Sequence, residues 1–354
     1  MVAAASPAPR PLALARWLFV VAAMIAAIVV VGGITRLTES GVSITEWNVV
    51  SGTLPPLTEG EWAAEFAKYR QTPQYILING PAGMTLATYK FIFFWEWVHR
   101  LLARTIGLVF ALPLVWFWLR GAIPAGYKPR LVALLALGAL QGVIGWWMVK
   151  SGIVHDVKVS HFRLATHLVV ALTTLGGVIW TALDLVALSR RRRPAVLQPL
   201  GVLTLLALAI QLVLGAWLAG LRAGVVAGAG WGQTDAWPLM QGRFWPAGID
   251  WSHGAIAAIS HDPYLVHFIH RWWAWGVVAL MVALARVARA RGNRPASIGL
   301  HAAFGTQILL GIATVWSGVW LPIAVLHQLT GALVVASTVW AAHAGGSAGP
   351  KAAS

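Results

Sequence analysis

The sequence predicts an all-α integral membrane protein with eight transmembrane helices. Of its 354 residues, 58% are hydrophobic and only 10% are charged, whereas an ordinary soluble domain carries about 25% charged residues. Eight stretches are long and apolar enough to cross a bilayer, which takes roughly 20 residues in a helix. The chain also lacks cysteine, which excludes disulfides and metal sites built on thiolates. These observations exclude an ordinary cytosolic enzyme.

The predicted spans follow the apolar stretches in chain order. They cover residues 16–35, 91–119, 131–149, 164–188, 196–221, 265–285, 298–316 and 322–342. The first is too long for the apolar core of a signal peptide and has no clear cleavage site after it. We therefore expect it to remain as a membrane helix.

The loops between the spans differ in charge. Those on one side carry Arg10, Arg16, Arg120, Lys128, Arg130, Arg190, Arg191, Arg192, Arg193, Arg286, Arg289, Arg291, Arg294 and Lys351. Cytoplasmic loops of membrane proteins are enriched in Lys and Arg, so both termini are predicted to lie in the cytoplasm. The net charge of +15 therefore indicates membrane topology rather than nucleic-acid binding. The outer side carries two long loops rich in glycine, proline and tryptophan, which we expect to lie along the membrane interface.

An internal repeat divides the chain. A Gln-x3-Gly motif followed by Ser-Gly occurs at residues 141–152 and again at 307–318, and Gln211 and Gly215 repeat its first part. Both the second and the sixth span open with a His-Arg pair. We predict two tandem four-helix bundles, residues 1–188 and 189–354, that run in the same sense through the membrane.

Four histidines lie near the start of predicted spans that enter from the outer side. They are His99, His167, His270 and His327. Ionisable residues inside apolar spans are costly and are therefore functional candidates. Two histidines on alternate helices of each half suit bis-histidine haem ligation, with zinc or copper as the alternative metal. Arg100 and Arg271 follow the first histidine of each half, where a guanidinium can pair with a haem propionate through two hydrogen bonds.

The other histidines give weaker signals. His155, His161, His253, His261, His301 and His343 have no partner in the repeat, and we interpret them as residues of loops and span ends.

Glu96 is the only glutamate within the predicted spans. It precedes His99 by three residues and therefore shares its helix face. Its equivalent in the second half is His267, so the two halves differ beside the predicted haem sites. We expect Glu96 to act as a general acid or base in the first half, while the second half transfers electrons. The other interpretation is structural: an ion pair with Arg100, four residues later, or a hydrogen bond to a histidine that binds the metal.

Longer motifs run through the first outer loop and the histidine segments. They occupy residues 32–41, 46–47, 52–57, 61–62, 69–73, 90–100, 163–168, 270–271 and 327–328, together with Phe66. Over nearly the whole chain these motifs resemble the haem A synthase family, in the subgroup that lacks a cysteine pair in the first outer loop.

The resemblance implies an oxidoreductase of the bacterial inner membrane that makes haem A for cytochrome oxidase. Such enzymes convert haem O to haem A by two successive hydroxylations of the C8 methyl group, which becomes a formyl group. The implied substrate-haem ligands are His99 and His167, with Glu96 as the acid–base group. The implied cofactor is haem B, held between His270 and His327, and the haem O synthase is an implied partner.

Other functions fit the same histidines. A di-haem b-type electron-transfer protein would use them without modifying haem, and a haem carrier or chaperone would pass haem on unchanged. His267 stands where the family commonly has glutamine, which leaves a spare potential ligand three residues before His270. The remaining candidate partners are an electron donor in the membrane and further copies of this chain in a homo-oligomer.

Overall fold

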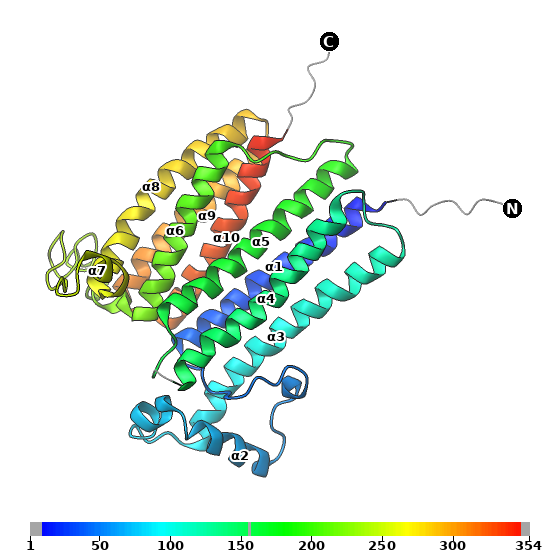
Figure 1. The fold of residues 1–354 in the computed structure, drawn as a ribbon. Coiled ribbons are helices and arrows are strands. Elements are labelled where there is room, and N and C mark those ends of the chain that lie inside the picture. Colours follow the sequence, from blue (N-terminus) through cyan, green and yellow to red (C-terminus); the bar gives the residue numbers. More distant parts are fainter. Residues whose placement is uncertain (1–8, 155–156, 348–354) are drawn as a thin grey trace.

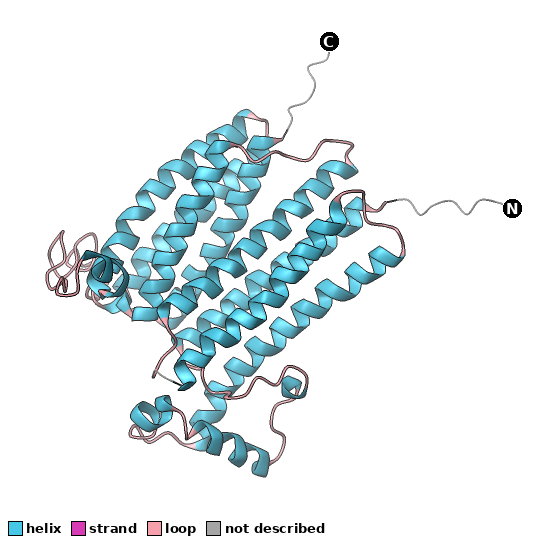
Figure 2. Ribbon diagram, viewed as in Figure 1, coloured by secondary structure: helices cyan, strands magenta, loops and turns pink. Residues whose placement is uncertain are grey.

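The computed structural model describes residues 9–154 and 157–347, and every regular element within them is a helix (Figure 1, Figure 2). Eight of the described helices are long and apolar enough to span a membrane, which confirms the predicted fold class. They are α1 Pro11–Leu37, α3 Leu86–Leu119, α4 Tyr127–Val154, α5 His161–Ser189, α6 Pro199–Leu221, α8 Pro263–Ala290, α9 Arg294–Trp316 and α10 Leu321–Gly346. His155 and Lys351 lie outside the described residues.

The spanning helices alternate in direction and bring the loops to two ends of the bundle. At one end, here called the basic end, lie loops 120–126, 190–198 and 291–293, the start of α1 and the end of α10. The backbone N–H of Arg10 donates to Ala122 O at 2.9 Å, and that of Val196 donates to Gly346 O at 3.2 Å. The opposite, outer end carries the two long loops with their short helices α2 Glu59–Tyr69 and α7 Ala255–His261 (Figure 1).

Each half of the chain forms a group of four packed spanning helices. In the first half, α1 packs against α3 and α5, and α4 also packs against both. In the second half, α6, α8, α9 and α10 pack in chain order, and α10 returns to α6. The halves meet where α5 packs against α6 and α10, and where α1 packs against α10. The internal repeat stays a prediction, which this similar packing supports.

A single hydrophobic core joins the two halves at the basic end. All eight spanning helices contribute to it, and residues such as Leu14, Leu131, Leu185 and Ala285 are completely buried there. Burial of apolar side chains also stabilises helix packing inside a membrane, through close van der Waals contact. The histidines at positions 99, 167, 270 and 327 lie beyond this core, towards the outer end.

Asp184 links both halves at the basic end. This completely buried carboxylate accepts hydrogen bonds from Arg130 at 2.6 Å and from the backbone N–H of Ala195 at 3.1 Å. Its other contact is His343 Nε2, at 2.9 Å. One carboxylate therefore holds α4, α5, α10 and the connection between the halves.

The outer loops are more regular than the sequence analysis expected. Helix α2 begins with a capping box, in which the side chains of Thr58 and Glu61 each accept a hydrogen bond from the other residue's backbone N–H. The helix packs on the start of α3 through a cluster of aromatic residues. Tyr69 is completely buried in this cluster, and burial raises the pKa of its hydroxyl to about 12. The neutral Tyr69 hydroxyl donates to Gln74 Oε1 at 2.9 Å and accepts from Asn79.

Candidate functional site

Each predicted haem-ligating histidine packs against a glycine of a neighbouring helix. A Cβ added to that glycine would lie closer to the imidazole Cε1 than an ordinary van der Waals contact. The four pairs, with that distance, are Gly32–His99 at 3.0 Å, Gly145–His167 at 3.1 Å, Gly215–His270 at 3.0 Å and Gly311–His327 at 3.2 Å. Only glycine lets the backbone approach the ring so closely. The structure therefore places each of the four histidines against a glycine in the same way.

The imidazoles of each half belong together. His99 on α3 and His167 on α5 lie close enough to interact electrostatically, and so do His270 on α8 and His327 on α10. All four side chains are half-buried rather than sealed by protein. Among the described residues no three His, Cys, Asp or Glu side chains gather as a metal site of their own.

Glutamines contact three of these histidines. The nitrogen–nitrogen distances are 3.0 Å for Gln141 Nε2 to His167 Nδ1, 3.2 Å for Gln211 Nε2 to His270 Nδ1 and 3.3 Å for Gln307 Nε2 to His327 Nε2. The sequence analysis found these glutamines in the repeat but assigned them no role. Their position one turn before the packing glycine was the available signal.

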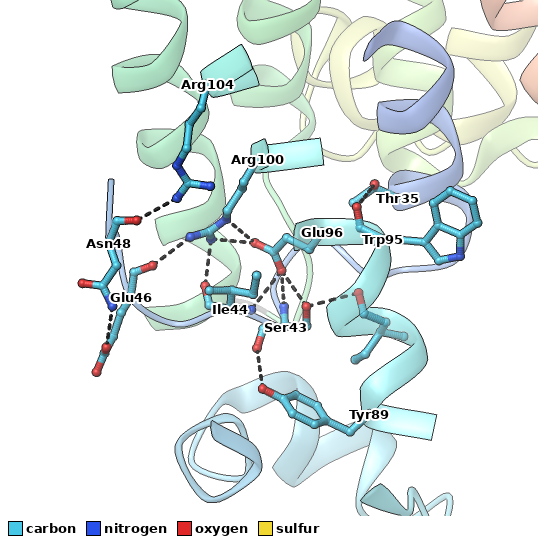
Figure 3. Close-up of polar contacts among 11 residues, drawn as sticks. Thr35, Ser43, Ile44, Glu46, Asn48, Tyr89, Trp95, Glu96, Arg100 and Arg104 are labelled. Atoms are coloured by element: carbon cyan, nitrogen blue, oxygen red, sulfur yellow. Dashed lines mark hydrogen bonds and ion pairs between the residues drawn. The ribbon is translucent and has the colours of Figure 1, made fainter. Parts of the chain in front are cut away.

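Glu96, three residues before His99 in the chain, is buried in a network of five hydrogen bonds with Ser43, Ile44 and Arg100 (Figure 3). Its Oε2 accepts from Ser43 N and Ser43 Oγ, both at 2.7 Å, and from Ile44 N at 2.9 Å. Its Oε1 accepts from Arg100 Nε and Nη2, at 3.1 and 2.6 Å. The carboxylate therefore forms the ion pair considered in the sequence analysis and also anchors the first outer loop.

Arg100 holds the same loop through its backbone carbonyls. Besides Glu96, its guanidinium donates to Ile44 O and Glu46 O, both at 2.8 Å, and lies 5.9 Å from the ring centre of Trp146. Arginine has five N–H groups, and these contacts occupy four of them. One N–H remains for another acceptor. To bind a propionate through two hydrogen bonds, Arg100 would also have to give up one of its present hydrogen bonds.

His267 and Arg271 repeat this arrangement in the second half. The ring of His267 contacts Ala223 O through Nδ1 at 2.8 Å and Arg271 Nη2 through Nε2 at 3.2 Å. Arg271 also donates to the loop carbonyls of Ala236, Pro238 and Leu239. Both His267 nitrogens thus have protein partners, and its resting geometry is that of a loop anchor rather than a spare axial ligand.

The histidine pairs have the chemistry of a haem site. Imidazole nitrogens are the axial ligands that iron porphyrins take in b-type sites. His99 Nδ1 and His327 Nδ1 are buried without a hydrogen-bond partner in the described part of the chain, as are the side-chain oxygens of all three glutamines. Buried polar atoms are normally paired, so unpaired atoms gathered around four imidazoles fit groups that bind a further ligand there.

Comparisons with known proteins identify the family of the chain. The chain is 70% identical to a heme A synthase of Novosphingobium aromaticivorans, over 97% of this chain and 98% of that protein. It is 56% identical to a heme A synthase of Erythrobacter litoralis, over 95% and 98% of the two chains, and 48% identical to one of Rhizorhabdus wittichii, over 96% of each. The model of the cytochrome oxidase assembly protein family COX15-CtaA matches residues 15–339. The chain therefore belongs to the COX15-CtaA family of cytochrome oxidase assembly proteins.

Proposed function

We propose that this protein is the membrane enzyme that oxidises haem O to haem A. The relatives that match it from end to end carry the name heme A synthase. The observation that carries the proposal is the set of four histidines, paired within each half and each set against a glycine. Two such pairs suit one substrate haem and one cofactor haem.

The proposed division of labour follows the two halves. His99 and His167 hold haem O by its iron in the first half, and His270 and His327 hold a haem B cofactor in the second. A bis-histidine haem supplies one-electron transfer. The two glutamine-contacted histidines of the second half, His270 and His327, suit a cofactor that stays bound.

The reaction turns the C8 methyl of haem O into a formyl group through two hydroxylations and the loss of water. With water as the source of the oxygen, this change releases four electrons and four protons to an electron acceptor. With O₂ as the source, each hydroxylation instead takes two electrons and two protons from a donor and releases one water. Glu96 is the proposed acid–base group, because its buried carboxylate lies one helical turn from His99. Its five hydrogen bonds fix its position, and Arg100 and Arg271 hold the two outer loops at the outer end of the bundle. Each arginine retains one N–H for a haem propionate.

We place the protein in the bacterial inner membrane with both termini in the cytoplasm. The eight apolar helices support a multi-pass membrane protein, and the gathering of Arg120, Arg130 and the 190–193 run at the basic end supports this orientation. The haem O synthase is a proposed partner, since haem O is poorly released to water. The membrane electron donor is the proposed further partner for the O₂-dependent route, in which each hydroxylation consumes two electrons.

The test is extraction of the haems from membranes that contain this chain together with a haem O synthase. We expect haem A, identified by chromatography and mass, that is absent when this chain is omitted. Haem B and haem O alone, under a competent electron supply, would contradict the proposal. That result would favour the electron-transfer or carrier function.

A further inference from the structure

The glutamines divide the four histidines into three and one. His167, His270 and His327 each lie beside a glutamine amide, at 3.0 to 3.3 Å between nitrogens. His99 has the packing glycine, Gly32, but no glutamine. The residue four positions before Gly32, on the same helix face, is Ile28. The Nδ1 of His99 is buried and has no partner in the described ranges.

A glutamine suits the ligated form of a histidine. When one ring nitrogen binds iron, the other carries the proton and needs an acceptor. The amide oxygens of Gln141, Gln211 and Gln307 are buried and unpaired among the described residues, so an amide that turns can supply that acceptor. For Gln141 and Gln211 this turn exchanges the present hydrogen bonds from Nε2 to His167 O and His270 O, at 2.7 and 3.1 Å, for the bond from the ring N–H. At His327 the ring also turns over, because its present contact is through Nε2.

His99 has no such acceptor. With its Nε2 on iron, its Nδ1–H would stay buried and unpaired, which is costly, because the position one turn before Gly32 is the apolar Ile28. Iron coordination is therefore less favourable through His99 than through the other three histidines. The second half has two supported ligands, whereas the first half has one supported and one unsupported ligand.

We propose that His99 is the axial ligand that detaches when haem O enters and haem A leaves, and that the three glutamines are positioning residues that keep the other ligands bound. The inference rests on the proposed function, and it assigns the exchange to one ligand. A cofactor haem needs two lasting bonds, whereas a substrate haem must be released in every cycle. The distribution of the glutamines matches this difference.

The test measures haem release from the full-length protein in detergent, loaded with haem B in the second half and haem O in the first. Excess apomyoglobin serves as the acceptor for released haem. We expect a fast phase for the haem on His99 and His167 and a slow phase for the haem on His270 and His327. The variant His270→Ala should lack the slow phase, which would identify that phase as release of the second-half haem.

Ile28→Gln supplies the missing amide. We expect it to slow the fast phase about tenfold, the effect of about one hydrogen bond, and to lower carbon monoxide binding by the reduced first-half haem. Ile28→Leu is the matched control and should leave both phases unchanged. Gln307→Leu removes a support in the second half and should speed the slow phase by a similar factor, which tests the proposal even if Ile28→Gln does not fold.

The outcomes separate the two proposals. Equal release rates for the two haems, unchanged in both Ile28→Gln and Gln307→Leu, would overturn the role of His99 while haem A formation stood. Absence of any haem bound through His99 and His167 would contradict the proposed function itself.

Discussion

At the scale of single residues, Glu96 and His267 occupy equivalent positions and perform equivalent structural work. Glu96 accepts hydrogen bonds from the backbone N–H groups of Ser43 and Ile44. His267 instead faces a backbone carbonyl, that of Ala223, to which its Nδ1 can donate. Each also contacts the arginine four residues later. The two halves therefore differ at this position partly because Glu96 meets backbone N–H groups of its loop, whereas His267 meets a backbone carbonyl.

Glu96→Gln tests whether Glu96 also moves a proton. Glutamine keeps an oxygen for the loop amides but has no ionisable group. We expect haem O conversion to fall by about 10²- to 10⁴-fold, the usual contribution of a general acid or base, while both haems still bind. Haem A formed per chain and bound haem per chain provide the two measurements.

Ser43→Ala is the matched control for the loop. It removes one hydrogen bond to Glu96 Oε2 and leaves the carboxylate in place, so most of the conversion should remain. Full conversion in Glu96→Gln would show that the residue acts only as a loop anchor.

At the scale of helices, the glycines that face the histidines decide how closely two helices approach. Gly311→Ala on α9 would place a Cβ 3.2 Å from His327 Cε1 and displace the ring. We expect loss of haem from the second half with the first half intact, and Gly145→Ala on α4 should have the converse effect. Bound haem and the low-spin absorption spectrum measure both changes.

The same helices provide controls for these substitutions. Gly305 on α9 and Gly142 on α4 have nothing within 4 Å of an added Cβ. Their alanine variants should keep both haems, since alanine favours a helix over glycine by about 1 kcal/mol. An unchanged haem content in Gly311→Ala would show that the close approach is unnecessary for ligation.

The sequence predicted the spanning helices because their apolar stretches exceed the length of a bilayer crossing. The fifth span was placed three residues too early, since Pro199 occupies the first turn of α6 and Gln198 is its N-cap. Helix α2 was missed, although the pair Thr58 and Glu61 is a capping-box signal. The Gln-x3-Gly repeat was found in the sequence, but the contact of its glutamines with the histidines was not predicted from it.

The loop contacts of Arg100 and Arg271 were beyond prediction for a different reason. Their partners are backbone carbonyls of distant segments, and any residue type supplies a carbonyl. The histidines and Glu96 were identifiable because ionisable side chains are rare within apolar spans. Their partners at Ser43 and Ile44 become visible only when the chain is folded.

At the scale of the whole molecule, Asp184 joins parts of both halves at the basic end. Asp184→Ala would leave His343 Nε2 and the backbone N–H of Ala195 without their buried partner, which is costly because buried polar groups lose their hydrogen bonds. We expect a lower unfolding temperature in detergent, measured by circular dichroism. Asp250→Ala, which alters an exposed loop carboxylate, is the control, and equal unfolding temperatures for the two variants would contradict the role of Asp184.

Gln328 connects the halves near the histidines. It follows His327 in the chain and donates to Val29 O on α1 at 3.2 Å, and an added Cβ on Gly33 would lie 2.6 Å from its Oε1. Gly33→Ala should therefore shift the midpoint potential of the second-half haem, although the substitution lies in the first half. Gly107→Ala, which meets nothing within 4 Å, should not shift it, and an unchanged potential in Gly33→Ala would rule out this connection.

The location of the hydrophobic core has a mechanical consequence. Because all eight spanning helices pack together at the basic end, that end can stay fixed while the outer ends of the helices move apart. A small splaying of the outer ends would separate the paired imidazoles while the core contacts stayed intact. On gentle warming, haem should therefore leave the protein well before the helices melt.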